Sequence, residues 1–137
     1  MTSDRLPDSV QTLLREHVST FEQLEVLLLM HAHPHDDWTA TAVAERSHIP
    51  EDLVNRGLTD LSGSGLIEQV RENPAAYCFA PRTTHLRQAA ADLAVAYRDQ
   101  RALVMSTMSV NAIERIRSET LRAFSDAFVL RRKDDDG

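Results

Sequence analysis

The sequence predicts a mainly α-helical fold with a small β hairpin and a helical C-terminal extension. Between residues 8 and 129, six stretches place apolar residues at the three- and four-residue spacing of amphipathic helices. Two short β-type runs, LIEQV at 66–70 and YCFA at 77–80, flank a turn that contains Asn73 and Pro74. Helical spacing resumes at residue 83, so the hairpin is followed by an extension built from helices.

Composition limits the class of protein before any motif is considered. The chain has 137 residues, 42% hydrophobic and 26% charged, which suits one domain with an extension. The longest apolar run, 26–30, is far too short to span a membrane, and the first residues lack the pattern of a signal peptide. A single cysteine, Cys78, excludes an internal disulfide. We therefore expect a cytoplasmic protein with no membrane association.

The net charge of −6 is unevenly distributed along the chain. Residues 1–38 carry two Arg against seven acids, and residues 39–81 carry three Arg against six acids. Residues 82–133 reverse this balance, with ten basic groups against five acids. The positive charge is therefore concentrated in the extension, and the last residues, RRKDDDG, are expected to form a solvated and disordered tail over 131–137.

Two helices are expected before residue 34. Residues 8–17 have helical spacing, and Ser19-Thr20 is followed three positions later by Glu22 and Gln23. This spacing is the signature of a capping box, so it predicts the start of a second helix. Pro34 ends that helix, because a proline disfavours helical backbone in the residue before it.

The next elements are marked by capping residues and by helix breakers. Thr39 is a good N-cap for a short helix over 39–48. Pro50 suits the start of the following helix, with Glu51 and Asp52 at the positive end of its dipole. That helix spans 50–64 and is stopped by glycines. After the hairpin, we expect one helix over 83–105 and another over 111–129.

The order of helix, helix, helix and hairpin across residues 20–81 resembles the winged helix-turn-helix. The stretch WTATAVAERSHIPEDLVNRGLTDLSGSGLIEQV has the small Ala44 where two helices cross and Ile49 in the turn between them. Leu58 and Leu61 lie on the inner face of the third helix, and Gly65 turns into the wing. The segments YCFAPRT, AADLAVAYRDQR and AFSDAF resemble, more loosely, bacterial regulators of the MarR type.

This resemblance implies a division of the chain into four parts. Residues 1–19 would form an N-terminal helix or arm, and 20–82 the winged helix-turn-helix domain. Residues 83–130 would form a helical extension for dimerisation, since it carries more apolar surface than one small domain can cover. The tail, 131–137, completes the chain. The implied function is a transcriptional regulator that binds duplex DNA as a homodimer.

In this architecture the third helix, 50–64, enters the major groove. Asn55 and Arg56 would read base edges, because an amide matches adenine and a guanidinium matches guanine. The expected contacts to the DNA backbone come from the same helix and from the wing: Thr59, Ser62, Arg71 and Arg82.

The acids of the third helix leave a second interpretation open. Glu51, Asp52 and Asp60 outnumber the single Arg56, whereas binding to phosphates requires cations. A dipole preference at the helix start explains the first two acids but not Asp60. The alternative is a winged-helix adaptor that binds another protein and does not bind DNA.

No other chemistry is expected. The stretch HAHPHDDW, 31–38, gathers His31, His33 and His35, but it lies where two helices are connected and has no remote ligands to complete a metal site. Cys78 has apolar neighbours and is expected to be buried and inert. No nucleophile motif, phosphate-binding loop or paired carboxylates stand out. We therefore expect no enzyme activity, no metal and no cofactor.

Overall fold

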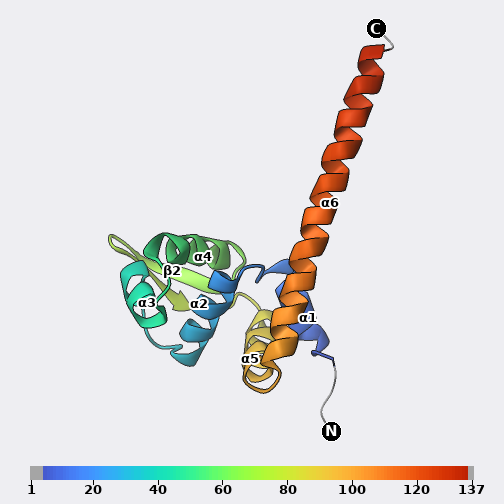
Figure 1. Cartoon of the computed structure of the whole chain (residues 1–137). Coiled ribbons are helices and arrows are strands. Elements are labelled where there is room, and N and C mark those ends of the chain that lie inside the picture. Colours follow the sequence, from blue (N-terminus) through green and yellow to red (C-terminus); the bar gives the residue numbers. More distant parts are fainter. Residues whose placement is uncertain (1–4, 136–137) are drawn as a thin grey trace.

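The computed structural model describes residues 5–135, with side chains described through residue 128. The element order is α1 (Asp8–Glu16), α2 (Phe21–Ala32), β1 (Trp38–Thr39), α3 (Ala40–Ser47), α4 (Glu51–Gly63), β2 (Ile67–Glu72), β3 (Ala75–Phe79), α5 (Thr84–Asp99) and α6 (Arg101–Asp135). In Figure 1, α2, α3, α4 and the sheet form one group, and α1, α5 and the start of α6 form another. The mainly α fold with a small hairpin is therefore confirmed.

The predicted capping residues explain where two of the helices begin. Thr20 accepts a hydrogen bond from the backbone N–H of Gln23, and the Gln23 side chain accepts one from the backbone of Thr20. This reciprocal arrangement is the predicted capping box. Thr39 caps α3 by accepting from the N–H of Ala42. Both predictions are confirmed.

The sheet has three strands in the order β1-β3-β2, although the sequence predicted a hairpin of two. The hairpin itself is present, with β2 and β3 antiparallel and Ile67 opposite Phe79. The added strand consists only of Trp38 and Thr39, which pair with Tyr77 and Ala76 of β3. This pairing covers the outer edge of β3 and holds the start of α3 against the wing.

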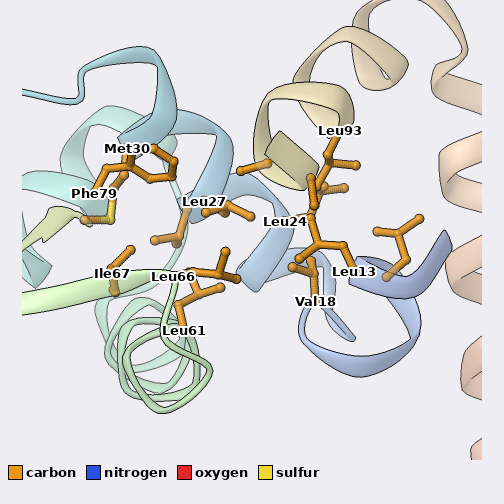
Figure 2. Packing of buried hydrophobic residues seen from close by; sticks show 14 of the residues in the cluster. Leu13, Val18, Leu24, Leu27, Met30, Leu61, Leu66, Ile67, Phe79 and Leu93 are labelled. Atoms are coloured by element: carbon orange, nitrogen blue, oxygen red, sulfur yellow. The ribbon is translucent and has the colours of Figure 1, made fainter. Parts of the chain in front are cut away.

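One hydrophobic core extends through both groups of elements, and α2 lies at its centre. Figure 2 shows Leu27 and Met30 of α2 on the side of Leu61, Leu66, Ile67 and Phe79. It shows Leu24, also on α2, on the side of Leu13, Val18 and Leu93. The helix is therefore buried on two sides, as its run of apolar residues predicted.

Residues 1–19 were expected to form a helix or an arm, and the structure has the helix α1, which packs against α5 and α6. The C-terminal segment differs from expectation in two ways. The last helix begins at Arg101 and is continuous, so the predicted break between residues 105 and 111 is wrong. The tail that was expected to be disordered is helical through Asp135, and 136–137 lie outside the described residues. Within the described residues, no helix is long and apolar enough to cross a membrane.

Candidate nucleic-acid interface

Helix α4 presents its polar residues on the face opposite the core. Val54, Leu58 and Leu61 are buried, and Gly57 lies close to the backbone at the start of α2. An ideal Cβ on Gly57 would lie 3.8 Å from the backbone nitrogen of Gln23, so α4 is seated closely on α2. The opposite face of α4 is thereby directed away from the domain.

Three of the residues expected to contact DNA lie on that outer face. Asn55, Arg56 and Thr59 are all exposed. The hydroxyl of Thr59 donates a hydrogen bond to the carbonyl of Asn55 at 2.9 Å. Its proton is therefore engaged within the helix, and Thr59 must break this bond before it can donate to a phosphate.

Two other predicted residues meet at the base of the wing. Ser62, which is partly buried at the end of α4, and the exposed Arg82 line one hollow of about 350 Å³ together with Gln69 of β2. Glu68 lines the same hollow, so its carboxylate offsets part of the positive charge of Arg82. The sixth predicted residue, Arg71, is exposed near the end of β2 and does not line this hollow.

Gly65 holds Arg82 in this position. It has a φ of 81°, which favours glycine, and its carbonyl accepts a hydrogen bond from the N–H of Arg82 at 2.8 Å. A Cβ on Gly65 would lie 2.8 Å from Cδ of Arg82, so the arginine side chain lies directly over the glycine. The sequence predicted that Gly65 forms the turn into the wing, but it did not predict the contact between Gly65 and the side chain of Arg82.

Two of the three acids of α4 are engaged within the chain. Asp60 accepts a hydrogen bond from the side chain of Gln23 at 2.9 Å, and Glu51 accepts one from the hydroxyl of Thr41 at 2.9 Å. The first contact joins α4 to α2 and the second joins α4 to α3. Asp60 therefore has a structural role that sequence reasoning missed, because its partner lies 37 positions away.

The His-rich segment packs on the sheet. The His31 ring meets Phe79 edge-on at 5.3 Å, and the His33 ring lies tilted against Trp38 at 5.8 Å. Among the residues that the structure describes, no three His, Cys, Asp or Glu side chains are grouped so that they could hold a metal ion. These side chains anchor the connection between α2 and β1.

Cys78 is half-buried on β3, not fully buried as the sequence predicted. Burial raises the pKa of its thiol, and the carboxylates of Asp37 and Glu68 raise that pKa further. A raised pKa leaves less of the reactive thiolate at neutral pH.

A larger hollow of about 690 Å³ is lined by residues of α2, α3, α5 and α6. The hydroxyl of Tyr97 on α5 donates to Glu25 on α2 at 2.9 Å. The guanidinium of Arg101 on α6 lies 4.8 Å from the centre of the Tyr97 ring. Burial raises the pKa of Tyr97, and the hydrogen bond to Glu25 raises it further. The hydrogen bond from Tyr97 to Glu25 joins the winged domain to the extension, and the contact between Arg101 and Tyr97 joins α6 to α5.

Comparison with known proteins identifies the fold. No protein-family model matches the chain, and no curated protein matches it. The structure is similar to the crystal structure of MepR, a transcription regulator of the multidrug efflux pump MepA of Staphylococcus aureus. The TM-score is 0.50 with 19% sequence identity, and the match covers 87% of each chain.

A point mutant of S. aureus MepR gives a similar result. Its TM-score is 0.51 with 18% identity, again over 87% of each chain. Residues 20–82 alone make up less than half of the chain, so a match over 87% of it also includes residues outside the winged domain. The chain therefore has the winged helix-turn-helix fold that its sequence resembled, within the helical architecture of these transcription regulators.

Proposed function

We propose that this chain is a cytoplasmic transcription regulator that binds duplex DNA as a homodimer, through α4 and the wing formed by β2 and β3. The observation that carries the proposal is the outer face of α4. It exposes Asn55 and Arg56, while Asp60 and Glu51 are engaged by neighbouring helices. The likeness of the whole fold to transcription regulators supports the same function.

The proposed contacts fall into two classes. Arg56 would bind a guanine through two hydrogen bonds, and Asn55 would bind an adenine in the same way. Ser62 and Arg82 at the base of the wing, with Arg71 further along β2, would bind phosphates and fix the position of α4 in the groove. Thr59 would join them after releasing the carbonyl of Asn55.

The exposed apolar side chains of α6 support the homodimer. Ile113, Ile116 and Phe124 are 57%, 64% and 71% exposed in the single chain. Large apolar groups that lie together on one surface indicate an interface. A two-fold pair would also present two copies of α4 to successive half-sites on DNA.

Arg56→Ala is expected to weaken binding to the preferred DNA site by about 1–3 kcal/mol, or about 5- to 150-fold, because a two-bond contact to one base is lost. The site is first obtained by in vitro selection from random duplexes. Fluorescence anisotropy at about 50 mM salt then compares the variant with the wild type.

Arg122→Ala is the matched control for this experiment. It removes the same charge from an exposed position on α6, far along the chain from α4, and should leave the affinity unchanged. A selection that enriches no sequence, with no binding to any duplex at this salt concentration, would contradict the proposal. Such a result in a protein that still dimerises would favour the adaptor.

A further inference from the structure

Helix α6 has apolar residues on two opposite faces. One face packs on its own subunit, where Val104 and Met108 are buried. At 3.6 residues per turn, Val110, Phe124 and Phe128 lie on the opposite side of the same helix. They are 53%, 71% and 58% exposed, so nothing in the described part of the chain covers them.

The residues on this side of the helix follow one another at intervals of three or four. We call them the seam: Leu103, Ser106, Val110, Ile113, Arg117, Leu121, Phe124 and Phe128. Leu103 is partly buried against the core of its own subunit, and the others are exposed. This is the spacing by which one helix packs along another in a coiled coil. The seam runs from the half of α6 that lies on the subunit into the half that stands clear of it (Figure 1).

Arg117 lies in the middle of the seam and is its only charged residue. It is exposed, and no ion pair within the described residues engages either Arg117 or its neighbour Glu114. When a second helix covers the seam, the guanidinium loses water and needs an acceptor. A parallel pair in register would instead place it against the same arginine of the other copy, which is unfavourable.

We propose that α6 pairs with α6 of a second copy in antiparallel orientation, about a two-fold axis near residues 115 and 116. This inference rests on the homodimer part of the proposed function and adds its geometry. Val110 then lies opposite Leu121, and Leu103 opposite Phe128. Near the two-fold axis, Arg117 of each copy lies between Ile113 and Glu114 of the other copy. Two symmetry-related ion pairs, each between Glu114 of one copy and Arg117 of the other, therefore form beside the apolar contacts.

The two halves of α6 have the lengths that this arrangement requires. The last partly buried residue of α6 is Arg115, and every described side chain from 116 to 128 is exposed. Helix α6 continues to Asp135, so its segment after Arg115, the standing half, is longer than its segment from Arg101 to Arg115. In the antiparallel pair, the standing half of one copy lies along the outer face of residues 101–115 of the other copy. Both surfaces therefore become covered.

Disulfide crosslinking distinguishes this orientation from a parallel one. In a Cys78→Ser background, one chain carries Val110→Cys and another, with an affinity tag, carries Leu121→Cys. Oxidation should crosslink the two chains when they are mixed, because these positions face each other. Neither variant should crosslink with itself, since its two cysteines would lie about 16 Å apart along the helices, beyond the reach of a disulfide.

The other outcomes each contradict a distinct part of the proposal. Crosslinking of Val110→Cys with itself would show a parallel pair and overturn the antiparallel seam, while leaving the homodimer intact. A dimer in sedimentation that crosslinks in no mixture would place the interface elsewhere and overturn the seam as well. A chain that sediments as a monomer would overturn both the seam and the homodimer, whereas DNA binding would still be decided by the Arg56→Ala titration.

A charge exchange tests the Glu114–Arg117 pair itself. Arg117→Glu should raise the dimer dissociation constant by about tenfold or more, because it places two acids together in each pair. The exchange of both charges, Glu114→Arg with Arg117→Glu, should restore most of the affinity. Arg122→Glu, on the opposite side of the helix, should change it little. Equal dissociation constants for all of these variants would overturn the pairing.

Discussion

Replacing Phe124 with glutamate is expected to convert a dimer of about 31 kDa, twice the 15.4 kDa chain, into a monomer. Phe124 is the most exposed of the large apolar side chains that the structure describes, at 71%, and it lies in the seam of α6. Burying a phenylalanine contributes about 1.5–3 kcal/mol, and a two-fold interface contains the residue twice. Loss of both contributions, with two charges added, should raise the dissociation constant by at least about 100-fold.

Sedimentation equilibrium at micromolar concentration measures this change. Arg122→Glu is the control, because it introduces an acid within one turn of Phe124 but on the opposite side of the helix. That variant should remain dimeric. A wild-type chain that sediments at 15.4 kDa under the same conditions would contradict the interface, and with it the spacing of two α4 helices on DNA.

Apolar spacing predicted most of the helices, and capping residues predicted where two of them begin. Thr20 with Gln23 and Thr39 act through neighbours three residues away, so a local pattern reveals them. Strand β1 was missed because it has only two residues and no alternation to detect. Its structure depends on pairing with Tyr77 and Ala76, far along the chain. Such pairing leaves no local signal.

The boundary between the last two helices was misplaced for a related reason. Polar residues at 106, 107 and 109 resemble a break when the sequence is read alone. In the structure, Val104 and Met108 are buried beside them, so tertiary packing keeps this segment helical. The chain changes direction earlier, at Gln100, which is the C-cap of α5.

For the candidate interface, helical spacing correctly predicted that Asn55, Arg56 and Thr59 of α4 are exposed, whereas Ser62 is partly buried. Asn55 and Arg56 lie on the outer face because Val54 and Leu58 fix the inner one. Spacing could not predict what engages Asp60, because the contact joins two helices that are far apart in the sequence. The contact between Gly65 and Arg82 depends on the backbone conformation of a turn, and amino-acid composition alone does not predict that conformation.

Gln23→Glu is expected to lower the free energy of unfolding by about 2 kcal/mol or more, because it places two carboxylates together at a nearly buried site. Gln23 is the only buried polar or charged residue among those described, and 4% of its surface is exposed. Its oxygen accepts from the backbone N–H of Ser19 at 2.7 Å, and its nitrogen donates to Asp60 at 2.9 Å. Glutamate keeps the first contact and replaces the second with repulsion.

The chain contains a matched control for this substitution. Gln88 donates to Asp92 at 2.9 Å, as Gln23 does to Asp60, but that pair is exposed on α5. Gln88→Glu should therefore change the stability by less than about 0.5 kcal/mol in urea denaturation followed by circular dichroism.

Combining Gln23→Glu with Asp60→Asn should restore most of the lost stability, because an amide can then donate to the new carboxylate. If Gln23→Glu alone were as stable as the wild type, Asp60 would not hold α4 on α2. Its charge would then stand beside Arg56 without a structural role, and the case for DNA binding by this helix would be weaker. Recovery in the double variant would instead show that the acid positions α4, and with it the face that carries Asn55 and Arg56.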